Sequence, residues 1–452
     1  MTRHAPDWPL RADLDLTGAP ATSTDPAGVA SGEPPVRVAQ PSSKRGPLTG
    51  KPAAAHRPPT KAPDRAARQR WSTASDLLRL VHAQPGITRT EACERLGLAS
   101  GAAAELIERL RRAHLIGERR AKRDAPGRPT TVLTAHPDGP LALVIELSMA
   151  GWRIWCGDLD GSVSEVAASS YGNQDPAGFL PGIAKAAATA ARGYGNRVRT
   201  VAAAVAGTVS GTRLLQFSTR GWDEADLSVL TSRFPSNSAP LLLAGNDAAL
   251  AGLAEARGGA ARGARVALHL LVAVGVGGAL IVDGQMVAGA QGAGGEYGHL
   301  PLGDPGLQCP CGARGCWDLM VDGRALARHR GDAPPTDPLA YARNLLNRLR
   351  PGTDSRDRAA AELTARDLGA GIGGLANAHD PDIITVGGIA PNLRAAAPDA
   401  FNEAYLAGLM TFHRRNPPPV LDATYGDEGP VRGALALAFD EITSPASLAT
   451  WV

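Results

Sequence analysis

Aromatic residues make up only 4% of this 452-residue sequence, and no run of eighteen apolar residues occurs in it. Because a membrane-spanning helix needs about 20 mostly apolar residues, the second absence argues against a transmembrane segment. The first ten residues carry charge and proline where a signal peptide has an apolar stretch. We therefore expect a cytoplasmic protein that has no membrane partner.

Cysteine is also scarce, and the few cysteines present are clustered. The chain has five, of which Cys309, Cys311 and Cys316 lie within eight positions. An odd and clustered set does not suit a disulfide framework. In a reducing compartment this pattern favours metal ligation.

The apolar content suffices for a large core, but charge is divided unevenly along the chain. Hydrophobic residues amount to 44%, which at this length predicts two or three domains. Residues 64–130 hold 14 Lys/Arg against 8 Asp/Glu, whereas residues 131–452 hold 25 against 31. A small basic region before a large acidic one indicates nucleic-acid binding at the N-terminal end.

Residues 1–66 are predicted to form a disordered tail. Twelve of the 36 prolines lie in residues 1–63, without apolar periodicity, so this stretch cannot bury enough surface to offset its ordering entropy. The alternative is a basic arm that contacts phosphates, since the same stretch holds 8 basic and 5 acidic residues.

Residues 67–135 have the pattern of a winged helix-turn-helix. A first helix carries Leu77, Leu78 and Val81 on one face and ends at Pro85-Gly86. A second begins at Thr88, which forms a capping box with Glu91. Ser100 is expected to cap a third helix, and extended segments at 115–116 and 130–133 would form the wing.

Beyond residue 135 the sequence is rich in strands and glycine. Residues 141–147, 152–159 and 163–169 are predicted as three consecutive strands, and alanine-rich helical stretches alternate with further strands after them. This alternation predicts an α/β architecture with two lobes.

The strongest local signal is a possible metal site. His299, Cys309, Cys311 and Cys316 lie within eighteen residues, separated by Gly and Pro, and this set suits tetrahedral zinc. Four protein ligands leave no open position, so the zinc would be structural. The alternative is three reduced thiols on a loop beside an ordinary histidine.

The segment that contains this cluster resembles the signature of the ROK family of sugar kinases and sugar-responsive repressors. The resemblance rests on GVGGALIVDG, GAGGEYGH and C-x-C-G-x-x-G-C, which stand in the family's order from Gly275 to Cys316. AGNDAALA (244–251), DIITVGGIAP (382–391) and GPVRGALALAF (429–439) extend it. The resemblance implies an α/β fold in which an N-terminal winged helix-turn-helix precedes a two-lobed, actin-like ATPase (ribonuclease H-like) ROK domain at 136–445.

The resemblance also implies a ligand site. Asn246, Asp247, Glu296 and His299 would bind hydroxyls of a hexose-like effector, and Asp247 stands at the position of the kinases' general base. Asp318 stands where the family has a sugar-contacting Glu, one methylene longer. Considered alone, Asn246 and Asp247 would equally suit a helix cap after a strand.

One departure from the family argues against catalysis. The kinases' first phosphate loop, D-x-G-G-T, is replaced by Glu146-Leu147-Ser148-Met149-Ala150. Backbone can approach phosphate closely only where glycine leaves room, so ATP is not expected to bind productively. We then interpret Gly275, Gly277 and Gly278 as turns that maintain the fold.

The predicted third helix would enter the DNA major groove and the wing a minor groove. The expected DNA contacts comprise residues of the helices and a basic wing ending in Gly127-Arg128-Pro129: Thr88, Arg89, Ser100, Gly101, Ala102, Glu105, Arg109, Arg120, Lys122, Arg123 and Arg128. A solvated basic hairpin is the alternative for the wing.

Three functions follow from these patterns. The first is a DNA-binding regulator, a repressor of carbohydrate-related genes, that senses a sugar or sugar phosphate and binds its operator as a homodimer or a dimer of dimers. The second is an active ROK sugar kinase with an added N-terminal domain. The third is a DNA-binding dimer that responds to no ligand.

Overall fold

The computed structural model describes residues 65–120, 131–172, 174–350 and 354–451. The predicted tail and the wing positions Lys122, Arg123 and Arg128 lie outside the described residues. Residues from Pro63 onward form one compact unit. The domain boundaries at 66, 135 and 445 remain predictions.

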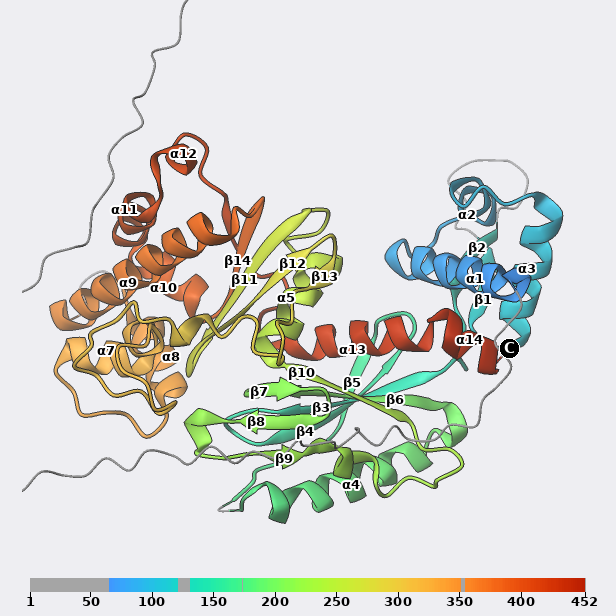
Figure 1. The fold of residues 1–452 in the computed structure, drawn as a ribbon, viewed down its shortest axis with the longest axis horizontal. Helices are drawn as coiled ribbons and strands as arrows, with labels where there is room; N and C mark the ends of the chain where they lie inside the picture. Colours follow the sequence, from blue (N-terminus) through green and yellow to red (C-terminus); the bar gives the residue numbers. More distant parts are fainter. Residues whose placement is uncertain (1–64, 121–130, 173, 351–353, 452) are drawn as a thin grey trace, which may run out of the picture. The chain divides into compact units, whose positions relative to one another are not determined.

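Three helices and a two-stranded sheet come first in the chain, as Figure 1 shows in blue and cyan. They are α1 (Arg65–Ala83), α2 (Arg89–Arg95), α3 (Ser100–Arg112), β1 (Ile116–Arg120) and β2 (Thr131–Ala135). The two strands pair antiparallel, with Ile116 opposite Ala135. Leu77, Leu110 and Leu133 are buried where these elements meet.

The start of α2 is as predicted, whereas the start of α3 is not. Thr88 Oγ1 accepts a hydrogen bond from the Glu91 amide at 3.2 Å, and Glu91 accepts one from the Thr88 amide at 3.0 Å. For α3 the cap position is Ala99, and no side chain caps the helix. The expected Ser100 cap is therefore wrong, because Ser100 is already the first helical residue.

The first large sheet has the order β10-β6-β3-β4-β5. Its strands are β3 (Leu141–Leu147), β4 (Trp152–Asp158), β5 (Val163–Ser169), β6 (Val198–Val205) and β10 (Leu241–Asn246), so the three predicted consecutive strands are confirmed. All seven residues of β3 are buried. Alternate β3 side chains face opposite sides: Val144 joins the core that includes Leu435, and Leu143 joins the core under α4 (Pro176–Arg192).

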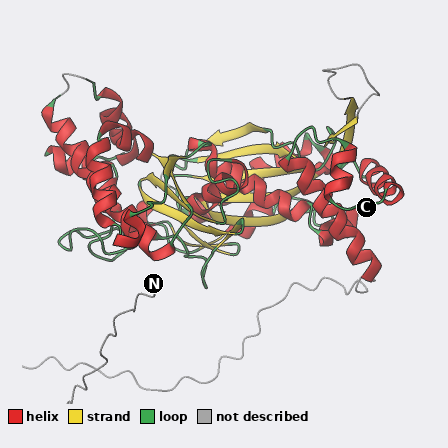
Figure 2. Ribbon diagram, turned by 90° about the horizontal axis from the view of Figure 1, so that it is seen from above, coloured by secondary structure: helices red, strands yellow, loops and turns green. Residues whose placement is uncertain are grey.

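The second large sheet has the order β13-β12-β11-β14-β15. Its strands are β11 (Val266–Ala273), β12 (Gly275–Val282), β13 (Gln285–Met286), β14 (Ile383–Gly388) and β15 (Val420–Asp422). Five helices lie around it and precede or follow its last two strands: α7 (Gly323–Arg330), α8 (Pro338–Arg348), α9 (Ser355–His379), α10 (Ala390–Ala396) and α11 (Pro398–Gly408). Figure 2, in which strands are yellow, shows helices at both ends of the strand region of the molecule.

One glycine prediction needs correction. Gly277 and Gly278 lie inside β12, not in a turn. A Cβ on Gly277 would come within 2.6 Å of the Ala248 Cβ, so the glycine lets the strand pass close to α5 (Asp247–Gly258). Gly275, with φ +106°, stands beside the hairpin connection and alone fits the expectation.

Helices α5 and α13 (Gly429–Ile442) pack against each other beside the two sheets. Helix α13 contacts β3 and β6, while α5 contacts β11 and β12. The segment GPVRGALALAF (429–439), which extends the family resemblance, lies in α13. The chain continues into α14 (Pro445–Trp451), which packs on α1.

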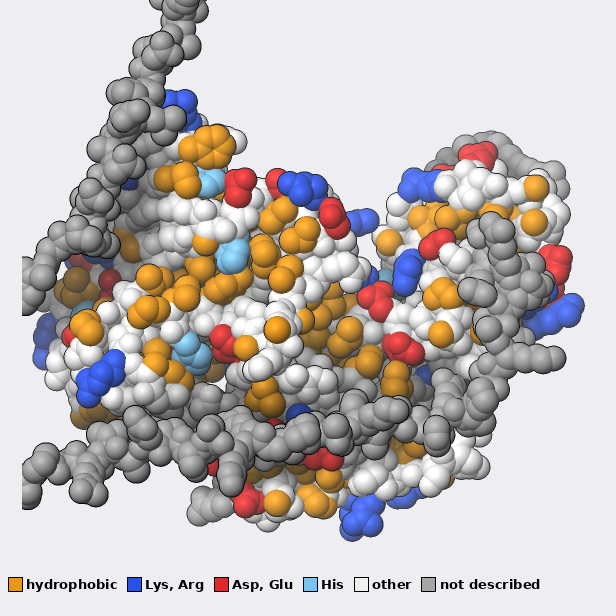
Figure 3. Space-filling model, in the orientation of Figure 1, with side chains coloured by type: hydrophobic (Ala, Val, Ile, Leu, Met, Phe, Trp, Pro, Cys, Tyr) orange, Lys and Arg blue, Asp and Glu red, His pale blue; other side chains and the backbone are white. Residues whose placement is uncertain are grey.

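The remaining elements are short. A three-stranded sheet consists of β7 (Thr208–Ser210), β8 (Arg213–Gln216) and β9 (Ala225–Asp226), and two single-turn helices are α6 (Asp318–Val321) and α12 (Thr411–Arg414). Phe412 in α12 and Met410 just before it are 70% and 47% exposed. Figure 3 shows hydrophobic side chains at several places on the face that it draws. Among the described helices, none has the length and apolar character that crossing a membrane requires.

Candidate functional site

A cleft of about 180 Å³ lies where β10 meets α5, and several of the predicted ligand residues line it. They come from separate parts of the chain: Asn246 and Asp247 at the β10–α5 junction, Glu296 and His299 on a short turn, and Asp318 on α6. The fold thus brings all five together. Gly207 and Thr208 add backbone and hydroxyl groups to the same wall.

Asn246 has the helix-cap role that was considered for it, and it also lines the cleft. Its Oδ1 accepts a hydrogen bond from the Ala249 amide at 3.0 Å, so it caps α5. Its Nδ2 donates to the Gly207 carbonyl at 3.2 Å. The cap therefore fixes the start of the helix at the cleft, with Asp247 as its first residue.

Asp247 has the properties of a proton acceptor near neutral pH. Burial disfavours its charged form and raises the pKa to about 7, and the carboxylates of Glu146 and Glu296 act in the same direction. One of its oxygens accepts a hydrogen bond from the Ala248 amide at 2.7 Å, which acts in the opposite direction. A general base needs a pKa in this range.

Glu296 and His299 face one another at the cleft wall. Thr208 Oγ1 donates to Glu296 Oε1 at 2.7 Å, and Glu296 Oε2 lies 3.9 Å from His299 Nε2. Both side chains are part-exposed, so they can still exchange hydrogen bonds with a bound hydroxyl. The other imidazole nitrogen, Nδ1, points toward Cys309, whose Sγ lies 3.9 Å away.

The predicted zinc ligands form a compact group. One atom from each of His299, Cys309, Cys311 and Cys316 lies within 4.8 Å of the others. For tetrahedral zinc with Zn–S bonds of about 2.3 Å, two sulfurs are separated by about 3.8 Å. The Cys311 and Cys316 sulfurs are 3.7 Å apart, so the donor set fits the ion. This group would hold a zinc ion with no open coordination position.

Asp318 also lines the cleft, and it is more buried than Glu296. Its carboxylate accepts a hydrogen bond from the Val276 amide at 2.6 Å, and the other oxygen lies 3.5 Å from His299 Nδ1. The residue is only 6% exposed. Asp318 therefore lies close to the imidazole, is held by a backbone amide and leaves little surface for a ligand.

The segment Glu146–Ala150 ends β3 and begins a tight turn. The Glu146 carboxylate accepts two hydrogen bonds from Arg153, of 2.8 and 3.0 Å, so its charge is paired. In the turn, Ser148 bonds to the Gly151 carbonyl at 2.9 Å. The Met149 sulfur contacts Thr219 Oγ1 at 3.0 Å, so a side chain lies on the cleft wall at this position.

The described DNA-contact candidates divide into free and paired residues. Ser100, Gly101 and Ala102 are exposed at the start of α3. Arg109 instead pairs with Glu105 at 2.9 Å, Arg89 lies 3.8 Å from Glu118, and Thr88 is held in its capping box. Arg120 is exposed at the end of β1.

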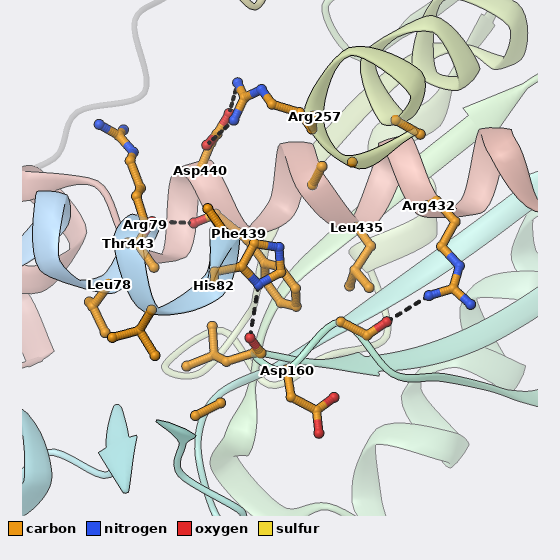
Figure 4. A pocket seen from close by; sticks show the side chains of 18 of the residues that line it. Leu78, Arg79, His82, Asp160, Arg257, Arg432, Leu435, Phe439, Asp440 and Thr443 are labelled. Atoms are coloured by element: carbon orange, nitrogen blue, oxygen red, sulfur yellow. Dashed lines mark hydrogen bonds and ion pairs between the residues drawn. The ribbon is translucent and has the colours of Figure 1, made fainter. Parts of the chain in front are cut away.

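Two features escaped prediction from the sequence. His114, His136 and Asp138 lie close together at the base of the β1–β2 hairpin and could hold a metal ion. A cavity of about 390 Å³, larger than the cleft, lies beside α1 and α13 (Figure 4). Its lining residues are distant in sequence, and no short motif marks them.

Comparison with known proteins identifies the region that contains the cleft. Residues 152–441 match the ROK family. The chain is 29% identical over 208 residues to a glucokinase of Streptomyces coelicolor, covering 43% of this chain but only 65% of that enzyme. It is 30% identical over 248 residues to a kanosamine kinase of Amycolatopsis mediterranei, covering 54% of this chain and 78% of that enzyme.

Solved structures share the fold. A ROK family transcriptional regulator, a homologue of the E. coli Mlc protein, superposes with a TM-score of 0.68 at 18% identity, over 85% of this chain and 99% of its own. A ROK glucokinase from Streptomyces griseus, in complex with glucose and AMPPNP, gives 0.55 at 25% identity, over 66% and 98%. The protein has the ROK sugar-kinase-like α/β fold, and with its family match across 152–441 the chain belongs to the ROK family.

Proposed function

We propose that the protein is a DNA-binding transcriptional regulator, a repressor of carbohydrate-related genes, whose ROK domain binds a sugar or sugar phosphate. The observation that carries the proposal is the unit of α1–α3 and β1–β2, which precedes the ROK match. Its three helices and antiparallel hairpin have the element order of a winged helix-turn-helix. The regulator structure covers 85% of this chain and the glucokinase 66%, which supports the same assignment.

Helix α3 would be the recognition helix. Its exposed first turn, Ser100 to Ala102, is small and uncharged, so direct base reading there would be limited. The wing would supply more of the contacts through Arg120 and, beyond the described residues, Lys122, Arg123 and Arg128. An arginine held by neighbouring Gly and Pro suits a narrow, A·T-rich minor groove.

The cleft supports the effector part of the proposal. Asn246, Asp247 and Glu296 present amide and carboxylate groups toward one cavity, and a polyhydroxylated ring requires such paired donors and acceptors. A structural zinc in the adjacent cluster would hold the loop that carries His299. We further propose that the protein acts as a homodimer, or a dimer of dimers, on a symmetric operator.

A sugar kinase is the second candidate. It is favoured by Asp247, which retains the position and the raised pKa of a general base. Against it stands the turn after β3, where Met149 lies on the cleft wall and the segment Glu146–Ala150 contains no glycine. The third candidate is a dimer that responds to no ligand. It is favoured by Asp318, whose carboxylate already accepts a hydrogen bond from the Val276 amide and lies beside His299, so that little of it is left for a ligand.

DNA binding is the first test of the proposal. The full chain should select A·T-rich inverted repeats from random duplexes, and Arg128→Ala should weaken the selected site more than random DNA. Contacts to phosphate carry no sequence information, so equal losses on both DNAs would reduce Arg128 to a phosphate contact. If the full chain binds no DNA duplex at about 50 mM salt, the proposal that it is a DNA-binding regulator is wrong.

Kinase activity is the second test. A coupled ATP assay with glucose, N-acetylglucosamine and kanosamine should give no turnover above that of Asp247→Asn. Turnover in the wild type that this substitution abolishes would instead establish the kinase.

A further inference from the structure

The 390 Å³ cavity differs from the sugar cleft in position and in chemistry. It is lined by α1, by the β4–β5 connection at Leu159–Gly161, by the end of α5 and by α13. All four segments belong to the compact unit that begins at Pro63. Its volume lies in the range of roughly 300–1,000 Å³ that small-molecule sites occupy.

One part of the lining is apolar. Leu78 and Val81 of α1 and Leu435 and Phe439 of α13 are each less than a tenth exposed and border the cavity. The His82 ring meets Phe439 edge to face, with 5.4 Å between ring centroids. A flat or branched hydrocarbon body would bury its surface against this part.

Among the charged side chains of the lining, cationic ones outnumber acidic ones. The lining includes four arginines and one histidine but only two aspartates, Asp160 and Asp440. Two arginines are already engaged: Arg257 forms two hydrogen bonds with Asp440, at 2.8 and 3.2 Å, and Arg432 bonds to the Gly161 carbonyl and to Glu428. Figure 4 shows both interactions with Asp440 and Gly161.

The other two arginines are available to a ligand. Arg262 is exposed and donates one hydrogen bond of 3.3 Å to the Ala83 carbonyl, and none of the ion pairs among the described residues includes it. Arg79 lies 4.0 Å from Asp76, with half of its side chain exposed. His82 bonds to the Leu159 carbonyl through Nδ1, which leaves its Nε2 edge for another partner. In Figure 4 the Asp160 carboxylate points away from the His82 ring.

We propose that this cavity is a second ligand site and that it takes a small organic anion with an apolar body, such as an aryl carboxylate or sulfonate. The body packs on Leu78, Leu435 and Phe439, and the anionic group meets Arg262 and Arg79. Arginine pairs with such groups through two parallel N–H donors. Binding there bridges α1 to α13 and so fixes the N-terminal helices against the ROK domain. This last consequence rests on the proposed function, whereas the site itself does not.

Two fluorescent probes test the site on the full-length protein. They are 8-anilinonaphthalene-1-sulfonate and N-phenyl-1-naphthylamine, which has the same rings without the sulfonate. The sulfonate should bind at one saturable site per chain, and Arg262→Gln should weaken it at least fivefold while changing the neutral probe less than twofold. Ala436→Phe, which fills the cavity from α13, should abolish binding of both. Arg265→Gln, exposed and outside the lining, is the matched control and should change neither.

The proposal is overturned if Arg262→Gln leaves the sulfonate unaffected, or if it weakens the neutral probe to the same extent. Retention of both probes by a folded Ala436→Phe protein also overturns it. If Ala436→Phe does not fold, titration of both probes with the Arg262→Gln protein, whose changed residue is exposed, still tests the proposal. Because these titrations contain no DNA, a protein that binds the probe but no duplex would contradict the proposed function and leave the second site standing.

Discussion

At the scale of single residues, the cleft is organised by side chains that serve structure and chemistry together. Asn246 caps α5 and borders the cleft, while His299 has one nitrogen toward Cys309 and the other toward Glu296. If zinc binds Nδ1, a sugar hydroxyl at Nε2 would contact the metal loop through one ring.

The metal cluster gives the first prediction. The purified protein should contain about one zinc per chain, and Cys311→Ser should lose it and lower the stability of the ROK domain, since metal binding contributes to folding free energy. Elemental analysis measures the zinc. Cys93→Ser, on α2, should retain it. Metal-free wild type with all three clustered thiols open to titration would contradict the assignment.

The second prediction concerns pH and Asp247. Its pKa is raised to about 7 in the folded protein, so the folded state binds a proton that the unfolded state releases near pH 4. The resulting stability is present at low pH and is lost as pH rises through 7. Asp247→Asn should therefore gain stability relative to the wild type between pH 4.5 and 8, by on the order of 2 kcal/mol after screening by the open cleft.

Urea unfolding at both pH values measures this difference. Asp223→Asn, at an exposed position, should follow the wild-type curve. Parallel curves for Asp247→Asn and wild type would show that the carboxyl titrates alike in both states.

At the scale of helices and strands, the sequence predicted the regular elements better than their contacts. The strand at 141–147 and the Thr88–Glu91 capping box carry local signals, and both are confirmed. The pairing of Glu146 with Arg153 depends on the register of the β3–β4 hairpin, in which these two residues are opposite. Local patterns do not encode that register, so the sequence alone does not predict that Arg153 neutralises Glu146.

The same reasoning explains the other discrepancies. Gly277 was interpreted as a turn because the sequence does not reveal that α5 passes against β12. The 390 Å³ cavity joins residues from four segments, and only the tertiary fold brings them together.

The third prediction concerns the start of α2. Thr88→Ala should remove the side-chain half of the capping box and destabilise the N-terminal helices by about 1 kcal/mol. Hydrogen exchange of the α2 amides measures the loss. Thr189→Ala is the control, since the Thr189 hydroxyl bonds within α4 to the Lys185 carbonyl and caps nothing. Unchanged protection of α2 would mean that the cap contributes nothing there.

At the scale of the whole molecule, the proposed function requires coupling between cleft and DNA. A ligand shifts a conformational equilibrium only by its differential affinity for the two states, and typical couplings are about 1–3 kcal/mol, or roughly 5–150-fold. If a sugar lowers the affinity of the protein for operator, operator must lower the affinity of the protein for that sugar by the same factor. The cleft turn of Glu296 and His299 is the element that both would influence.

The fourth prediction follows from that reciprocity. From a panel of hexoses, N-acetylhexosamines and their 6-phosphates, the compound that raises the melting temperature most should bind at least fivefold more weakly in the presence of operator. Calorimetry with and without DNA measures it. Glu296→Ala should abolish the binding, and Glu165→Ala, on β5 and outside the cleft, should not. Equal affinity for free and DNA-bound protein would exclude that compound as the inducer.

Packing of α14 on α1 determines how late in synthesis the core around α1 can be completed. Leu448 of α14 is fully buried in the same core as Leu77 of α1, so the first helix completes its packing with a segment that the ribosome produces much later. At roughly 5–20 residues per second, on the order of tens of seconds separate the two. During that time the part of the α1 surface that packs on α14 is exposed to chaperones and to other nascent chains. A chain that has not yet reached α14 is therefore expected to leave part of α1 uncovered, so this part of the core forms only when synthesis is almost finished.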